Sequence, residues 1–197
     1  MKVFSDKSLE ETKGEFVSLL LETGRDNMDA LAGWLESETD FYTAPASTKG
    51  HGSFEGGLLV HSMNVYRLLK NFNKNIGIER EDSIIIAGLL HDVCKVNMYV
   101  KTVRNVKIPG ERRWEEVEGY GIEDSFPFGH GEKSVYLLAR HISLTDEEAM
   151  AIRWHMGGYD DAARAYIGGL TQANAYQTYK LAPALAIADM YATYFAD

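Results

Sequence analysis

Two segments of the chain pair a helix-start signal with apolar residues at helical spacing. Ser8 is followed by Glu11 and then by apolar residues 19–21, and Thr145 is followed by Glu148 and a second apolar stretch. A Ser or Thr with Glu three residues later forms a capping box, in which each side chain satisfies a free backbone N–H of the first turn. These signals predict one helix near each end of the chain.

The same periodicity predicts helices over most of the remaining sequence. His61, Val65, Leu68 and Phe72 lie at i, i+4, i+7 and i+11, which is one stripe of a helix. Residues 83–96 are apolar almost all round, as in a buried helix. Further helices are expected at residues 27–36, 132–141, 146–156 and 161–167, and from residue 173 to the C-terminus with a bend at Pro183.

One segment departs from helical spacing. Residues 99–107 alternate and are rich in valine, and residues 114–120 resume after a Pro109-Gly110 turn signal. Residues 40–55 contain the proline and glycines of a loop. We predict an all-α helical bundle with a β-hairpin insertion near residues 98–120. The chain is expected to divide into a helical appendage over residues 1–40 and one domain over residues 41–197.

Composition restricts the function classes. The net charge of −9 argues against long duplex nucleic acid as a partner, and the basic stripe on the hairpin is more simply a solvated surface. Cys94 is the single cysteine, so no intramolecular disulfide can form. The sequence has no apolar leader and no run of about 20 apolar residues, so we expect a soluble, cytoplasmic protein without a membrane partner.

Several polar residues lie where an apolar side chain is expected. His61 occupies the apolar stripe of its helix, His91 and Asp92 end an apolar run, and Asp189 lies in another. A buried histidine bonded to backbone would explain each histidine alone. Buried carboxylates without nearby cations are costly, however, so a shared divalent cation is the better hypothesis. His130 and His155 lie at predicted helix ends and taken singly are ordinary polar residues there.

The order of these residues resembles the HD superfamily of metal-dependent phosphohydrolases. Residues 56–62 (GGLLVHS) and 87–95 (AGLLHDVCK) are similar to the segments around the first histidine and the His-Asp pair, in particular in the HD domain of bacterial 3′-to-5′ exoribonucleases. The likeness covers roughly residues 45–195, so it implies an HD metal-binding domain within residues 41–197. Cys94 departs from the glycine that many relatives have at this position.

The resemblance implies a ligand set and cofactors. His61, His91, Asp92 and Asp189 would bind a first metal ion, and His130 and His155 would join Asp92 at a second. Nitrogen and oxygen donors suit one or two divalent transition-metal ions, namely Fe, Mn, Co, Ni or Zn.

The implied activity is hydrolysis of a phosphoester through a metal-activated water, with a nucleotide or short oligonucleotide as the small phosphorylated substrate. Asp92 and Lys95 are the expected catalytic residues. Lys95 would also bind substrate phosphate, although a lysine at a helix C-terminus can simply offset the helix dipole. His51 is a further candidate for substrate contact. Two alternatives stay open: an HD-fold di-iron oxygenase that cleaves a C–C or C–P bond, and a non-catalytic metal-containing ligand-binding module.

Overall fold

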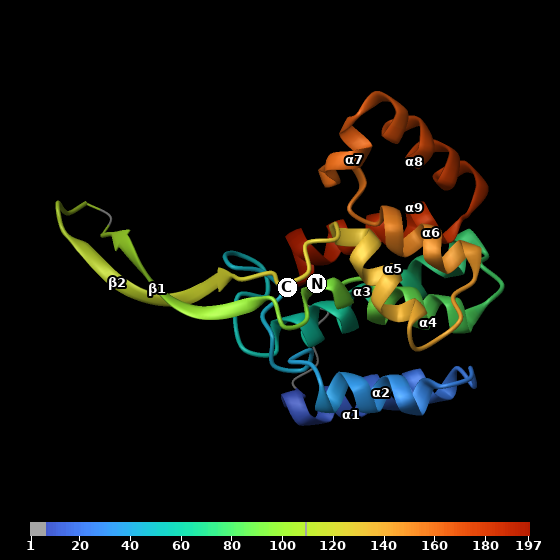
Figure 1. Cartoon of the computed structure of the whole chain (residues 1–197), viewed down its shortest axis with the longest axis horizontal. Coiled ribbons are helices and arrows are strands. Elements are labelled where there is room, and N and C mark those ends of the chain that lie inside the picture. Colours follow the sequence, from blue (N-terminus) through green and yellow to red (C-terminus); the bar gives the residue numbers. More distant parts are fainter. Residues whose placement is uncertain (1–6, 109) are drawn as a thin grey trace.

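Both capping boxes begin helices as predicted. In the computed structural model, which describes residues 7–108 and 110–197, Ser8 caps α1 and Thr145 caps α6, each with its reciprocal glutamate bond. The described residues form nine α-helices and one two-stranded sheet, which confirms the all-α class (Figure 1). The helices are α1 (Leu9–Glu22), α2 (Met28–Ser37), α3 (Gly57–Ile76), α4 (Glu81–Leu90), α5 (His130–Ala139), α6 (Asp146–Trp154), α7 (Asp161–Arg164), α8 (Tyr166–Thr178) and α9 (Leu181–Tyr191).

The core lies around α3, which packs against α4 and α9, while α6 packs against α5 and α9. Leu58, Leu89 and Leu185 are fully buried there. Each such leucine contributes about 1.5–3 kcal/mol relative to exposure. Helices α1 and α2 lie side by side along one face of the body (Figure 1), and their Phe16 and Leu31 join the same hydrophobic core. The division of the chain at residue 40 stays a prediction.

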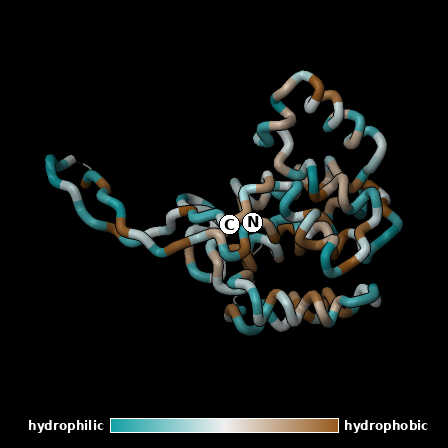
Figure 2. Tube along the Cα trace, viewed as in Figure 1, coloured by the Kyte–Doolittle hydropathy of each residue, from teal (hydrophilic) through white to brown (hydrophobic). Residues whose placement is uncertain are grey.

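The hairpin projects away from the helical body (Figure 1). Strand β1 (Tyr99–Lys107) pairs antiparallel with β2 (Trp114–Ile122), from Tyr99 opposite Ile122 to Lys107 opposite Trp114. The second strand therefore runs two residues past the predicted end. Gly110 in the connection has a φ of 83°, as a turn glycine allows, while Pro109 lies outside the described residues. Hydrophobic residues are interspersed with hydrophilic ones along this hairpin (Figure 2).

The predicted helix over residues 83–96 is shorter than expected. Helix α4 ends at Leu90, Asp92 leaves the helical region with φ −101° and ψ 16°, and Val93–Lys95 form a separate 3₁₀ turn, η1. Asp92 and Lys95 are therefore not on α4, and the prediction of one helix through residue 96 was wrong. The turn brings both side chains to the end of the helix instead.

The C-terminal helices also differ from the prediction. One helix was expected from residue 173, but α8 begins at Tyr166, and the break falls at Tyr179, whose backbone is extended. Pro183 is the third residue of α9. Its missing N–H has no partner in the first turn of a helix, so it does not bend the chain. A π-helical turn, η3 (Ala192–Ala196), then leads to Asp197. In residues 7–108 and 110–197, no helix has the length and apolar character needed to cross a membrane.

Candidate metal centre

The structure brings the six predicted metal-binding residues together from five separate parts of the chain. They are His61 on α3, His91 at the C-cap of α4, Asp92 before η1, His130 at the start of α5, His155 at the C-cap of α6 and Asp189 on α9. His130 and Asp189 are partly exposed, and the other four side chains are buried. Five helices thus present their termini or inner faces to one point.

Asp92 lies at the centre of this cluster. Its Oδ1 atom is 2.8 Å from His130 Nε2 and 3.4 Å from His155 Nε2. Its Oδ2 atom is 3.5 Å from His61 Nε2 and 3.6 Å from His91 Nε2. The two oxygens of one carboxylate therefore face two pairs of histidines, which is the arrangement a bridging ligand needs.

The tautomers of two histidines follow from their hydrogen bonds. His91 Nδ1 donates to the Gly88 carbonyl at 3.0 Å, and His155 Nδ1 donates to the Ile152 carbonyl at 2.7 Å. With the proton on Nδ1, each Nε2 atom directs its lone pair into the cluster. Burial lowers the pKa of His91 to about 3, despite the opposing effect of Asp92, so the ring stays neutral as a metal ligand must be.

His155 provides the clearest test of whether a cation fits. Its Nε2 atom is buried and has no hydrogen-bond partner among the described residues, although Asp92 Oδ1 lies 3.4 Å away. A lone pair facing a carboxylate oxygen repels it, and a buried polar atom without a partner costs about 1–3 kcal/mol. A cation between the two atoms would remove both penalties, so the donor set fits a metal ion.

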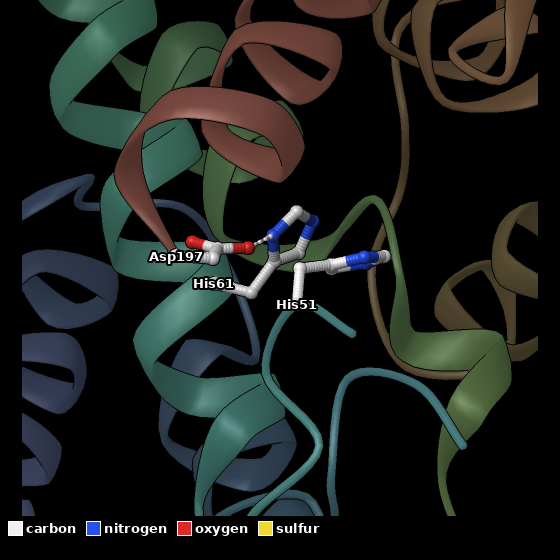
Figure 3. Close-up of side chains that lie close together, drawn as sticks. All are labelled: His51, His61 and Asp197. Carbon is white, nitrogen blue, oxygen red and sulfur yellow. Dashed lines mark hydrogen bonds and ion pairs between the residues drawn. The ribbon is translucent and has the colours of Figure 1, made fainter. Parts of the chain in front are cut away.

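His61 is held by a carboxylate that no sequence pattern marks. Asp197 Oδ2 lies 2.5 Å from His61 Nδ1 (Figure 3). The other Asp197 oxygen accepts from Asn64 Nδ2 at 3.0 Å. His61 Nε2 is 3.1 Å from Asp189 Oδ1. Burial opposes the charged ring, but these two carboxylates outweigh it and raise the pKa of His61 to about 10 without a metal. Binding of an ion at Nε2 would release that proton to solvent.

His51 lies beside His61 at the edge of the cluster. Its ring centroid is 5.6 Å from that of His61, and it is half-buried in the loop before α3 (Figure 3). Burial lowers the pKa of His51, and His61 and Lys95 add to this effect. Its position fits the predicted substrate contact, which stays a prediction.

Lys95 reaches the cluster from η1. Its ammonium nitrogen lies 2.6 Å from Asp92 Oδ2, and the side chain is mostly buried. Burial opposes its charge, but Asp92 outweighs this effect and raises the pKa of Lys95 above its usual range. The structure thus places a permanent cation directly beside the central carboxylate.

Ion pairs outside the cluster fix the segments that carry His130 and His155. Lys133 pairs with Asp124 at 2.6 Å, which ties the start of α5 to the loop that follows β2. A Cβ on Gly131 would lie 2.2 Å from the Arg153 carbonyl, so α5 and α6 approach closely only because this residue is glycine. The Arg153 side chain pairs with Asp160 at 2.7 Å, beyond the end of α6.

The cluster opens into a cleft of about 390 Å³. His51, Asp92, Lys95, His130, His155 and Asp189 line its polar part. The rest of the wall is largely apolar or aromatic, with Tyr99 and Ile122 from the base of the hairpin and Tyr159, Met190 and Tyr194 from the C-terminal segments. A substrate in this cleft would meet both charged groups and apolar or aromatic side chains.

Comparison with known proteins agrees with this geometry. The model of the HD domain family matches residues 58–194, which include all six clustered residues. No curated protein and no solved structure gave a significant match. HD domains bind divalent metal ions and include metal-dependent hydrolases, and the clustered histidines and aspartates could hold such an ion. Because the match covers more than half of its length, the chain belongs to the HD domain family.

Proposed function

We propose that the protein is a phosphohydrolase that cleaves a phosphoester bond in a nucleotide or short oligonucleotide. The observation that carries this proposal is Lys95, whose ammonium lies 2.6 Å from Asp92 and lines the same cleft as the histidines. A site that only had to hold cations would be weakened by a fixed positive charge next to its central ligand. A site that binds an anionic phosphoryl group would use that charge.

Two sets of side chains would hold the ions. His61, His91, Asp92 and Asp189 form one set, and Asp92, His130 and His155 form the other, so one or two divalent transition-metal ions would bind. A bound ion would supply Lewis acidity toward the phosphoryl oxygens and lower the pKa of a coordinated water toward neutrality. In this reading Lys95 holds a phosphoryl oxygen, while His51 contacts the substrate at the cleft edge.

The shape of the cleft supports a small phosphorylated substrate with an aromatic part. Tyr99, Tyr159 and Tyr194 line the same cleft as the charged groups. Any of the nucleobases can stack on such side chains, and the stacking contributes about 1–3 kcal/mol of binding free energy per base. The proposed substrate would place its base against these tyrosines and its phosphate against Lys95.

Two substitutions test the proposal, with metal content and hydrolysis of an aryl phosphodiester and an aryl phosphomonoester as readouts. Asp92→Asn should lose both metal and turnover, because it removes the charge shared by the two ligand sets. Lys95→Met should keep its metal but lose about 2 kcal/mol of phosphate binding in the transition state, about 30-fold in kcat/KM. Lys101→Met, on the exposed part of the hairpin, should behave as wild type.

Each alternative activity has its own signature in the same experiment. Full metal occupancy without hydrolysis of either ester, together with oxygen consumption on an organic substrate, would replace the proposal with an oxygenase. Full occupancy with nucleotide binding but no turnover of any kind would identify a ligand-binding module.

A further inference from the structure

Cys94 is a buried thiol in an unusual environment. Its Sγ atom lies 3.5 Å from His130 Nδ1 and 3.6 Å from His130 Nε2, whereas a buried cysteine usually packs among apolar side chains. Its backbone N–H donates to Ser134 Oγ at 3.1 Å, which anchors η1 to α5. The sulfur is thus held against the histidine that also contacts the central aspartate.

Three donors of different chemistry meet at this point. Asp92, Cys94 and His130 each offer a ligand atom, and the three atoms lie within 4.8 Å of one another. At zinc-like bond lengths, sulfur and nitrogen ligands of a tetrahedral ion are about 3.6 Å apart, and the Cys94 Sγ to His130 Nε2 distance is 3.6 Å. The sulfur therefore already lies at ligand spacing.

An independent observation points to a cation at the same place. His155 Nε2 is buried, has no hydrogen-bond partner among the described residues, and faces Asp92 Oδ1 at 3.4 Å. Nitrogen and oxygen ligands of a tetrahedral ion are also about 3.4 Å apart at zinc-like bond lengths. His155 thus supplies a fourth donor on the side of Asp92 that faces His130.

We propose that Cys94 is a thiolate ligand of the ion held by Asp92, His130 and His155. This inference rests on the proposed metal binding but changes the chemistry of one position. When the ion binds, the S–H bond breaks, its proton passes to solvent and a sulfur–metal bond forms, with no change of oxidation state. A thiolate selects borderline ions such as Zn²⁺, Co²⁺ and Fe²⁺ over Mn²⁺ and Mg²⁺, so the two positions would differ in metal preference.

Absorption spectroscopy of the cobalt-loaded protein tests this directly. Cobalt bound by thiolate gives an intense sulfur-to-metal charge-transfer band in the near ultraviolet. Because Cys94 is the only cysteine in the chain, such a band can arise from no other thiol in a preparation kept reduced with a phosphine. We expect the band in full-length wild type as the second equivalent of Co²⁺ binds.

Two variants locate the sulfur ligand. Cys94→Ser keeps the size of the side chain, so it should lose the band, retain the ligand-field bands of the other ion, and bind the second ion at least about tenfold more weakly. Asp189→Asn changes a ligand of the other set and leaves Asp92, Cys94 and His130 in place, so it should keep the band.

The outcomes separate this proposal from the one it rests on. Two bound cobalt ions without a charge-transfer band in wild type would overturn the role of Cys94 and leave metal-dependent hydrolysis intact. A charge-transfer band that is present in wild type but disappears in Asp189→Asn would place the sulfur on the other ion. That result would also overturn the role of Cys94. Failure to bind any Co²⁺ would overturn both proposals.

Discussion

Removing the carboxylate of Asp197 should weaken metal binding without touching a metal ligand. Asp197 is a positioning residue: it fixes the His61 ring through the 2.5 Å bond to Nδ1, and both side chains are about 1% exposed. Loss of such a carboxylate behind a metal-binding histidine typically lowers metal affinity 10–100-fold. Since each factor of ten equals 1.4 kcal/mol, Asp197→Ala should cost about 1.4–2.8 kcal/mol of binding free energy.

Asp197→Asn provides a graded comparison. Its amide oxygen can still accept from His61, but the bond loses its charge, and charge-assisted bonds are roughly twice as strong as neutral ones. The asparagine variant should therefore lose roughly half the free energy lost by the alanine variant. Affinity would be measured by competition of Zn²⁺ or Co²⁺ between the protein and a fluorescent chelator.

A surface aspartate serves as the control for charge alone. Asp161 is 96% exposed in its side chain, and Asp161→Ala should leave the metal affinity unchanged. Melting curves in excess chelator would show that each variant still folds. The reasoning fails if Asp197→Ala folds normally and binds metal within twofold of wild type.

Three further predictions concern stability. An ion present at 100 times its Kd stabilises the folded state by about 2.7 kcal/mol, so removing the ions with a chelator should lower Tm by about 5–11 °C. An unchanged Tm would contradict binding to the folded state alone. Arg25→Met leaves the fully buried Glu148 without its cation. Because Arg25 is one-fifth exposed, we expect the free energy of unfolding in urea to fall by about 2–3 kcal/mol. The control Arg80→Met, at a more exposed arginine, should lower it by less than about 1 kcal/mol. Glu148→Gln in the Arg25→Met background should recover much of that loss. Hydrogen bonding from Arg80, reinforced by Arg25 against the effect of burial, lowers the pKa of Asp82 to about 2, below its ordinary 3.8. The contribution of ionised Asp82 to the free energy of unfolding is complete above about pH 4 and is lost toward pH 2. The stabilities of wild type and Asp82→Asn should therefore converge as the pH falls through that window.

The sequence predicted most of the cluster because burial leaves few explanations for its residues. His61, His91, Asp92 and Asp189 lie in apolar stretches, where a polar group must have a partner, and the structure brings these four residues together. Their roles as ligands stay predictions. Asp197 follows no apolar stripe, so no periodic signal marks it. Only the packing of η3 against α3 brings it to His61.

The errors in the fold have a common cause. Hydrophobic periodicity predicted one helix through residue 96, but it cannot show where backbone geometry changes inside an apolar run. Helix α4 ends at Leu90, and this ending directs Asp92 and Lys95 toward the cleft. Pro183 likewise suggested a bend, although a proline in the first turn of α9 is compatible with a straight helix.

The long sequence separation across the cluster has a consequence for folding kinetics. His61 and Asp197 are 136 residues apart, and closing a loop of that length costs about 4 kcal/mol of chain entropy beyond a constant. We expect such contacts to form late, after the local helices and the α3–α4 pair, so that the ions do not nucleate the fold. We expect bound metal to act on the unfolding rate and to leave the refolding rate almost unchanged. The metal centre would then provide kinetic stability, because it forms only after the rest of the fold and slows unfolding.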